Sequence, residues 1–531
     1  MSDPLLQQRE LVQHLLASTD AADTALIETH VSWLLLIGGF AYKIKKALDL
    51  GFLDYSNLHR RRFFCEEEVR LNSRTAPTIY LAAVAITGSP QQPCLEGDGE
   101  ALEYAVKMRR FPDGCLLSEL AHDDRLTPAL IDTLAAHVAK FHAAAARADQ
   151  ASPWGSMDET GHPVAENFAQ ILPHLIDAAQ REQVEQIAEW ARATQRQQRT
   201  LIEQRRETGF VRECHGDLHL GNIVLLDGKP RLFDGIEFSE RLRWIDVLND
   251  SAFLMMDLEA HGLRDLAWRF LDAYLQHTGD YAALPLLYWY LSYRAMVRAK
   301  IAALRAGQIA DPEGRRCAQT ECSRYLQQAA GYAQAPKPRL IITRGLSGSG
   351  KTYHGQRLLE SLALVRLRSD VERKRLFGLR ADERSGSTLE GGIYSTKASE
   401  QVYAQLLAQS RYLLESGLSV LVDATFLKRA QRQVFFGLSK ALQVPFLILD
   451  FQASEDTLRQ RIIRRNAEGK DASEADITVL EQQRVQEEKL GEDERDSALK
   501  IDTESAQAGA QLAVAVERYF ATLDLTNARK A

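Results

Sequence analysis

One glycine-rich loop constrains the fold of this chain more than any other feature. The loop runs from Gly345 to Thr352 as GLSGSGKT and follows the apolar run Leu340-Ile341-Ile342. A buried strand, this spacing of glycines with a final Lys-Thr pair, and a following helix together form a phosphate-binding loop (P-loop). The sequence therefore predicts a nucleoside triphosphate site built on a sheet of alternating strands and helices.

Each residue type in this loop has a physical role. Glycines allow successive backbone N–H groups to turn inward around the β-phosphate. The Lys351 ammonium adds positive charge near the β- and γ-phosphate oxygens, and the Thr352 hydroxyl can bind Mg²⁺. The residues expected to bind ATP are Gly345, Ser347, Gly348, Ser349, Gly350, Lys351 and Thr352.

Length and charge limit the classes of protein to which the chain can belong. Its 531 residues exceed one ordinary domain, so two or three domains are expected. The formal net charge of −7 argues against a general nucleic-acid-binding protein and leaves only a local basic groove for such a partner. The six cysteines include no CxxC pair, which favours reduced thiols over a metal or disulfide framework.

The chain shows no pattern typical of export or of membrane insertion. Its first residues are polar and acidic, unlike the basic and then apolar segments of a secretory signal. The most apolar run begins at Trp33, is interrupted by Gly38-Gly39 and is too short to cross a bilayer. We therefore expect a cytoplasmic protein with no membrane partner.

A proline-containing stretch at 331–338 predicts an extended linker, because Pro336 and Pro338 cannot continue a helix. We place the main boundary there, between a domain at 1–335 and a domain at 336–531. Strands and helices alternate after the linker, which predicts a parallel sheet with helices on both faces. The expected strands are 340–344, 364–368, 419–423 and 446–451, and the expected helices are 351–362 and 396–416.

The first domain is expected to have a small strand-rich lobe, about 20–112, and a helical large lobe, about 113–330. Asp227-Gly228 between two apolar runs predicts a β-hairpin at 223–233 in the large lobe. The fold class is thus α/β and α+β multidomain. Before the large lobe, helices are expected at 4–17 and 60–74, and strands within 24–47, 78–85 and 103–111.

The predicted hairpin brings polar side chains together. Asn222 precedes its first strand and Asp234 follows its second, so both are expected at its open end. An amide oxygen and a carboxylate there can share a Mg²⁺ ion bound to triphosphate oxygens. Asp217, in the turn before the hairpin, is then free to accept a proton from a substrate hydroxyl and mainly orients that nucleophile. His215 is expected to brace the loop.

These residues resemble a known family. The pattern H-G-D-x-x-x-x-N at 215–222, followed by Asp234-Gly235, is similar to that of the aminoglycoside phosphotransferase group of the protein-kinase-like fold, which includes choline and homoserine kinases. The resemblance covers about residues 25–330. It implies that Lys43 holds the α- and β-phosphates of ATP and that Glu68 is its ion-pair partner.

The chain departs from that family in two places. No G-x-G-x-x-G loop covers the phosphates, and the metal motif reads Asp-Gly-Ile-Glu-Phe at 234–238. Glu237 of this motif is expected to bind the metal or to support a metal ligand. The alternative is an inactive lobe that retains the fold. The resemblance also implies structural roles for Asp246 and Asp250.

Charged residues follow the strands of the second domain. Asp370 comes after the second strand, whose carboxyl end faces the P-loop, and is the candidate base, with Arg373 reaching the acceptor or its phosphate. Asp423 ends another strand and fits a carboxylate that supports Mg²⁺. Helical spacing places three arginines on one face of a lid over the transferring phosphoryl group, namely Arg461, Arg464 and Arg465.

Residues 338–505 resemble the P-loop kinases that include polynucleotide 5′-kinases, gluconate kinases and zeta-type toxin kinases. The P-loop, Ser-Asp-x-x-Arg at 369–373 and Asp-Ala-Thr at 423–425 are the basis of this resemblance. The alternatives are that Asp370 is an ordinary helix N-cap and that the lid arginines form a solvated face. Another basic stripe, at helical spacing in the large lobe, comprises Arg294, Arg298 and Lys300. It either contacts an anionic acceptor or belongs to a surface or salt-bridged helix.

Together, the two resemblances imply a bifunctional ATP-dependent kinase with two separate Mg-ATP sites. Each site would move the γ-phosphoryl group of ATP to a hydroxyl group of a small molecule. One alternative is a nucleotide-gated regulatory protein with one inactive kinase lobe. Another is a toxin-like kinase that acts on a nucleotide sugar or a nucleic-acid 5′ end, so a nucleic acid would be a partner only at the C-terminal site.

Overall fold

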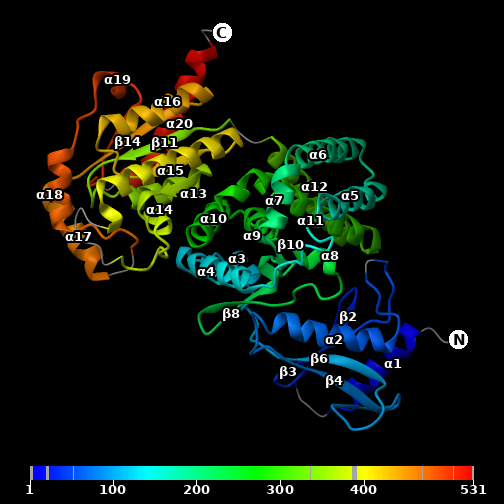
Figure 1. Cartoon of the computed structure of the whole chain (residues 1–531). Helices are drawn as coiled ribbons and strands as arrows, with labels where there is room; N and C mark the ends of the chain where they lie inside the picture. Colours follow the sequence, from blue (N-terminus) through cyan, green and yellow to red (C-terminus); the bar gives the residue numbers. More distant parts are fainter. Residues whose placement is uncertain are drawn as a thin grey trace. The chain divides into compact units, whose positions relative to one another are not determined.

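The computed structural model describes residues 4–19, 23–51, 53–334, 337–385, 392–468, 471–505 and 507–528. Figure 1 draws the chain and labels many of its helices and strands. The chain divides into two compact units. The first comprises Met1–His261 and Trp289–Ala330, and the second comprises Gly262–Tyr288 and Gly331–Ala531. The second unit thus includes a segment that lies well before the expected linker. The division at residue 335 stays a prediction.

The small lobe of the first unit is built on one antiparallel sheet with the strand order β1-β2-β3-β6-β4-β5. Strands occur in the three regions where the sequence predicts them, and the short β5 is an addition. The bounds are β1 Thr24–Glu28, β2 Ser32–Ile37, β3 Phe40–Lys45, β4 Tyr80–Ser89, β5 Gln92–Leu95 and β6 Glu103–Arg109.

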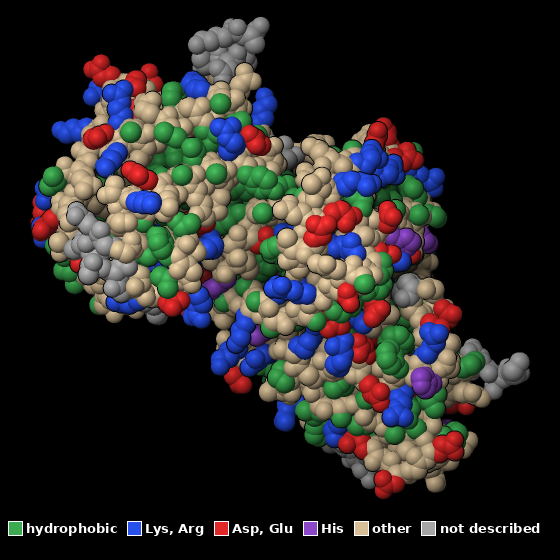
Figure 2. All heavy atoms as spheres, viewed as in Figure 1, with side chains coloured by type: hydrophobic (Ala, Val, Ile, Leu, Met, Phe, Trp, Pro, Cys, Tyr) green, Lys and Arg blue, Asp and Glu red, His purple; other side chains and the backbone are tan. Residues whose placement is uncertain are grey.

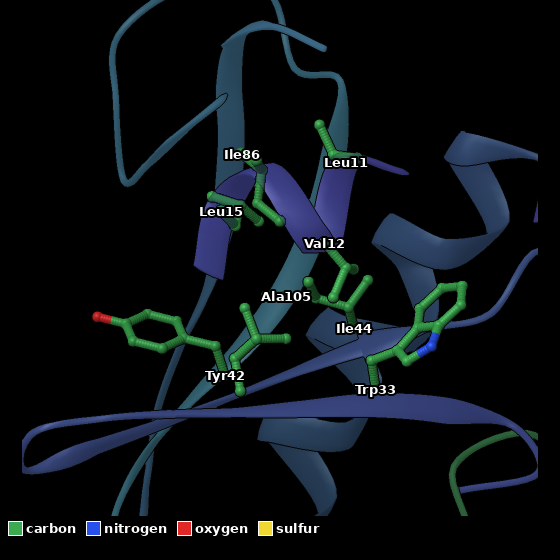
Figure 3. Packing of buried hydrophobic residues seen from close by; sticks show 9 residues of the cluster. Leu11, Val12, Leu15, Trp33, Tyr42, Ile44, Ile86 and Ala105 are labelled. Atoms are coloured by element: carbon green, nitrogen blue, oxygen red, sulfur yellow. The ribbon is translucent and has the colours of Figure 1, made fainter. Parts of the chain in front are cut away.

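Helices cover both faces of this sheet. Side chains alternate along each strand, so apolar residues point to both faces and each face packs against a helix. Tyr42 and Ile44 of β3 pack against α1 (Pro4–Ala17), in the buried cluster drawn in Figure 3. Ala41, on the other face, packs with α2 (Leu58–Asn72) in a second cluster. The same alternation places Lys43 and Lys45 of β3 on the α2 face, toward the candidate site.

The large lobe is mainly helical and contains the predicted hairpin. Strands β8 (Ile223–Leu226) and β9 (Lys229–Leu232) pair in antiparallel register, and Asp227 and Gly228 both have the positive φ that such a tight turn needs. The principal helices are α3 Leu117–His122, α4 Pro128–Ala144, α5 Met157–Ile171, α6 Ala178–Gln197, α7 Arg199–Glu207, α9 Val247–Ala260, α11 Leu287–Gln308 and α12 Pro312–Ala333. A short antiparallel pair, β7 Val211–Glu213 and β10 Trp244–Asp246, flanks the hairpin segment in the sequence.

The second unit contains a parallel five-stranded sheet in the order β12-β13-β11-β14-β15. The P-loop leaves the carboxyl end of the central strand β11, which is the edge where open α/β sheets bind ligands. The strands are β11 Leu340–Arg344, β12 Val365–Arg368, β13 Val420–Asp423, β14 Phe446–Gln452 and β15 Ala498–Asp502. The principal helices are α13 Lys351–Leu362, α14 Ser369–Leu376, α15 Thr396–Glu415, α16 Arg429–Leu442, α17 Glu455–Glu468, α18 Ile477–Gln486 and α20 Ala508–Ala528, together with α10 Arg264–Thr278 from the inserted segment.

The predicted fold class, α/β and α+β multidomain with a parallel sheet in the C-terminal part, is confirmed. Among the described residues, no helix is both long enough and apolar enough to cross a membrane. On the face shown in Figure 2, acidic and basic side chains are interspersed.

Candidate active sites

In the first unit, Lys43 forms the centre of an ion-pair network. Its Nζ lies 3.0 Å from Glu68 Oε1 and 2.5 Å from Asp234 Oδ1. Burial lowers the pKa of Lys43, but Asp234 and Glu68 outweigh this effect and raise the pKa well above its usual range. Lys43 therefore stays positively charged. It contacts Glu68 of α2, its predicted ion-pair partner, and Asp234, a predicted metal ligand.

A second lysine, which the sequence reasoning missed, shares the same carboxylate. Lys45 lies two residues further along β3 on the same face, with its Nζ 2.6 Å from Glu68 Oε2. Lys45 Nζ also pairs with Glu237 Oε1, and the Tyr55 hydroxyl donates to the same oxygen. Glu237 is buried and paired with Lys45, so its carboxylate does not face the metal residues as a free ligand. The Lys-x-Lys alternation in a strand places Lys45 on the same face as Lys43, but it does not identify the carboxylates that pair with Lys45.

Asp217 and Asn222, predicted to be neighbours, are in direct contact. Asn222 Nδ2 donates to the Asp217 backbone oxygen at 2.9 Å and to Asp217 Oδ2 at 3.0 Å. The Asn222 amide oxygen therefore points away as an acceptor. Burial raises the pKa of the Asp217 carboxyl, but His219, His215 and Arg294 outweigh this effect and hold the pKa well below its usual range.

Buried side chains hold the loop around Asp217 in place. The Asp250 carboxylate accepts hydrogen bonds from the backbone N–H groups of His215 at 3.0 Å and Gly216 at 2.9 Å. Arg294 Nη1 donates to the Gly216 carbonyl oxygen at 2.9 Å, so this arginine of the basic stripe has a structural partner. His215 Nε2 lies 2.9 Å from the Phe233 carbonyl oxygen, a contact that ties the loop to the end of the hairpin.

The residues at the open end of the hairpin fit a divalent cation. The Phe233 N–H donates to the Asn222 carbonyl oxygen at 3.0 Å, which keeps the two strand ends adjacent. Asp234 has a positive φ of 60°, and its side chain is 43% exposed. An exposed carboxylate and an amide oxygen are ligands that Mg²⁺ accepts. Asn222 and Asp234 are therefore suited to hold the ion, as the sequence predicts.

The contact between His219 and Asp217 gives a pH-dependent prediction. His219 Nε2 lies 3.4 Å from Asp217 Oδ2. Burial lowers the pKa of His219, but Asp217 and Asp257 outweigh this effect and raise it above the usual 6.5. Because folding favours the protonated form, the stabilisation is complete below about pH 6.5 and is lost as pH rises through the higher folded-state pKa.

We therefore expect His219→Gln to lower the melting temperature more at mildly acidic than at alkaline pH. The measurement is thermal unfolding of wild type and variant across that pH range. His30→Gln, at an exposed bend, is the matched control and should change the melting temperature little. An equal loss for His219→Gln at all pH values would contradict the prediction.

In the second unit, the P-loop has the backbone that its glycines predict. Gly345 and Gly348 have φ values of 144° and 81°, and a Cβ would lie 2.5 Å and 2.7 Å from the nearest carbonyl oxygen, respectively. Lys351 Nζ donates to the carbonyl oxygens of Gly345 and Leu346, both at 2.8 Å. Burial lowers the pKa of Lys351 to about 8, against the opposing effects of Asp423 and Asp370.

One cavity of about 1230 Å³ brings the predicted residues of this unit together. It is lined by five residues of the P-loop and by all three lid arginines. Gly345 and Ser349 belong to the loop but do not line the cavity. The predicted residues at its wall are Ser347, Gly348, Gly350, Lys351, Thr352, Asp370, Arg373, Asp423, Arg461, Arg464 and Arg465.

The two aspartates of this cavity differ in their surroundings. Asp423, the last residue of β13, is only 5% exposed, and its Oδ2 accepts no hydrogen bond from the described residues. Such a buried carboxylate oxygen fits a Mg²⁺ site. Asp370 lies in the first turn of α14, whose N-cap residue is Arg368. The alternative that Asp370 is the N-cap is therefore wrong.

The arginines around the cavity are held by the backbone. Arg373 Nη1 donates to the Ile393 carbonyl oxygen at 2.8 Å. Arg461 Nη2 donates to the Thr503 carbonyl oxygen at 2.9 Å, and Arg465 Nη2 donates to the Ala475 carbonyl oxygen at 2.6 Å. Arg461 and Arg465 are thus anchored, which differs from the alternative of a solvated face. Arg464 is exposed at the cavity wall.

The second unit therefore carries a P-loop at the end of its central parallel strand, and the first unit carries a network of Lys43, Glu68 and Asp234. Residues 340–490 match the sequence model of the AAA domain family. Together with the loop and the sheet order, this match confirms the predicted P-loop fold in the C-terminal part of the chain.

Curated proteins from two Mycobacterium species are similar over most of the chain. Uncharacterized protein Rv2004c of Mycobacterium tuberculosis strain H37Rv is 29% identical over 455 residues, which cover 86% of this chain and 89% of that protein. Uncharacterized protein Mb2027c of Mycobacterium bovis matches with the same values.

Solved structures are similar to parts of the chain. A gluconokinase from Sinorhizobium meliloti 1021 is 20% identical and covers 36% of this chain and 98% of its own, with a TM-score of 0.27. A choline kinase from Cryptosporidium parvum Iowa II is 12% identical and covers 62% of this chain and 96% of its own, with a TM-score of 0.39.

Proposed function

We propose that the chain is an ATP-dependent phosphotransferase with two separate Mg-ATP sites, each of which moves the γ-phosphoryl group to a hydroxyl of a small molecule. The observation that supports this function best is the set of contacts around Asp217. Asn222 Nδ2 donates a hydrogen bond to Asp217 Oδ2 at 3.0 Å, while Asp234 at the other end of the same hairpin pairs with Lys43 at 2.5 Å. A module that only binds nucleotide needs no such carboxylate beside the metal residues.

In the first unit, Asp217 orients the acceptor hydroxyl. Its low pKa keeps the carboxylate ionised, which suits a loose phosphoryl transfer that needs little early deprotonation. Lys43 binds the α- and β-phosphates, and Glu68 fixes the position of its ammonium. Asn222 and Asp234 would hold Mg²⁺, which supplies neutralisation of phosphate charge when bound.

In the second unit, Lys351 and the P-loop N–H groups bind the β- and γ-phosphates. Asp370 orients the acceptor hydroxyl, and Arg373 contacts the acceptor. Arg461 and Arg465 stabilise the charge of the transferring group, where one well-placed donor contributes several kcal/mol. Thr352 and Asp423 would hold Mg²⁺, which supplies the same neutralisation there.

The experiment is transfer of labelled γ-phosphate from Mg-ATP into a small-molecule extract. It compares wild type with Asp217→Asn, Lys351→Ala and the double variant. We expect each single variant to lose a different product, or a different phosphorylation of one product, by about 10²–10⁴-fold. Asp227→Asn is the control, because it makes the same substitution in the exposed hairpin turn and asparagine tolerates the positive φ of 51° there.

The outcomes separate the candidate functions. A product that only one variant loses identifies the active site and reduces the proposal to one kinase. No product in any sample, with ATP still bound by wild type, would contradict the proposal and favour a nucleotide-gated regulatory protein. A labelled nucleotide sugar as the product, or transfer of the label to an added oligonucleotide with a 5′-hydroxyl, would favour the toxin-like alternative.

A further inference from the structure

The P-loop unit contains a helix that is encoded in the middle of the kinase-like part of the sequence. Helix α10 (Arg264–Thr278) belongs to the second compact unit and packs against α13, the helix that follows the P-loop. Arg269 of α10 forms an ion pair with Glu360 of α13 at 2.7 Å. Two further residues of α10, Asp272 and Gln276, contact the strand β12 that leads to Asp370.

Asp272 fixes an arginine that reaches the P-loop helix. Asp272 and Arg366 are 5% and 2% exposed, and they form two hydrogen bonds of 2.7 and 3.2 Å. Arg366 Nη1 also donates to the Thr352 carbonyl oxygen at 3.3 Å. Thr352 is the P-loop residue proposed to hold Mg²⁺. A buried guanidinium needs a fixed anion, and in this unit α10 supplies that anion.

Gln276 fixes a second arginine, which lies beside the other proposed Mg²⁺ residue. Arg368 Nη1 donates to Gln276 Oε1 at 3.0 Å, and its Nη2 donates to Asp471 Oδ1 at 3.1 Å. These two partners hold Arg368 Nε at 3.8 Å from Asp423 Oδ2. That separation is too long for a hydrogen bond, so the Asp423 oxygen remains open to a cation.

Gln276 and Asp272 are themselves joined, since Gln276 Nε2 donates to Asp272 Oδ2 at 2.5 Å. One face of α10 therefore restrains both arginines of β12. Without Gln276, Arg368 would lose one of its two partners and could close onto Asp423. A guanidinium–carboxylate hydrogen bond there would compete directly with a divalent cation.

We propose that Gln276 and Asp272 are positioning residues of the P-loop site, acting through Arg368 and Arg366 to keep Asp423 and Thr352 available to Mg²⁺. This inference rests on the proposed function of that site. It means that the P-loop site is complete only with a helix from the other part of the sequence.

The test measures Mg²⁺ dependence of ATP binding rather than turnover. The increase in melting temperature that ATP causes in the full chain is recorded while Mg²⁺ is titrated. The share of this increase that is absent in Lys351→Ala is assigned to the P-loop site. We expect Gln276→Ala to raise the half-saturating Mg²⁺ concentration about tenfold, as for other groups that support metal ligands. Gln276 is the better position for this substitution because its side chain is only half-buried, so replacing it disturbs packing less than replacing the buried Asp272.

A rescue variant distinguishes this mechanism from simple loss of packing. Gln276→Ala combined with Arg368→Gln removes the competing guanidinium, so its Mg²⁺ dependence should equal that of Arg368→Gln alone. Arg269→Ala, which breaks the ion pair between α10 and Glu360 of α13, should leave the Mg²⁺ dependence unchanged. If Gln276→Ala titrates like Arg269→Ala, the inference is wrong. If wild type shows no Lys351-dependent binding, the proposed function of the site is wrong as well.

Discussion

The Glu68→Ala variant should lose about 3–5 kcal/mol of folding free energy, the usual cost of removing one partner from a buried ion pair. Glu68 is fully buried and lies 3.0 Å from Lys43 Nζ and 2.6 Å from Lys45 Nζ. Burial raises the pKa of its carboxyl, but the two lysines outweigh this effect and hold the pKa well below its usual range. The variant leaves both ammonium groups short of an anion in a site that excludes most water. Urea denaturation measures the loss.

Helix α2 provides a matched control for this prediction. Glu66 pairs with Arg62 at 2.9 Å, and both side chains are more than half exposed. Such a surface pair contributes less than about 1 kcal/mol, so Glu66→Ala should leave stability nearly unchanged. Equal stabilities for Glu66→Ala and Glu68→Ala would contradict the role of Glu68 as the shared anion of two lysines.

Features encoded by short stretches of sequence were predictable. The P-loop needs glycines at fixed spacing because a Cβ would collide with backbone oxygens, and those glycines are visible in the sequence. The hairpin at Asp227-Gly228 brings Asn222 and Asp234 together through two short strands and one turn. The Lys43–Glu68 contact followed from the resemblance and from the apolar face of α2.

Features that depend on distant partners were not predictable. Lys45 and Glu237 are 192 residues apart, and no local pattern links them. The sequence indicated that Glu237 binds the metal or supports a metal ligand, and the long-range ion pair with Lys45 leaves the supporting role as a prediction. Strand β15 (Ala498–Asp502) is an edge strand with mixed polarity, so its hydrophobic pattern is weak.

Helix α10 shows the same limit at the level of domains. Its sequence predicts an amphipathic helix, but amphipathicity does not specify which sheet or helix covers the apolar face. The structure pairs it with α13 and β12 of the P-loop unit through Arg269 and Asp272. A division of the chain by sequence order alone therefore separates the P-loop from residues that contact it.

ATP affinity of the P-loop site is expected to fall about tenfold per pH unit once the pH exceeds the pKa of Lys351. Burial lowers that pKa to about 8 in the free protein. Phosphate oxygens favour the ammonium form, so the pKa is higher when the nucleotide is bound. Between these two pKa values, binding must take up one proton, and the free energy of binding becomes less favourable as pH rises.

Calorimetric titration with Mg-ATP between about pH 7 and pH 10 measures this loss. Buffers of different ionisation enthalpy report the proton taken up on binding. Lys351→Arg is the matched control, because a guanidinium stays charged throughout this range and its affinity should not follow the same slope. Lys351→Ala should bind weakly at every pH, and the site of the first unit contributes the same background to all three proteins. If the ATP affinity of Lys351→Arg fell with pH as steeply as that of wild type, the titrating group would not be Lys351.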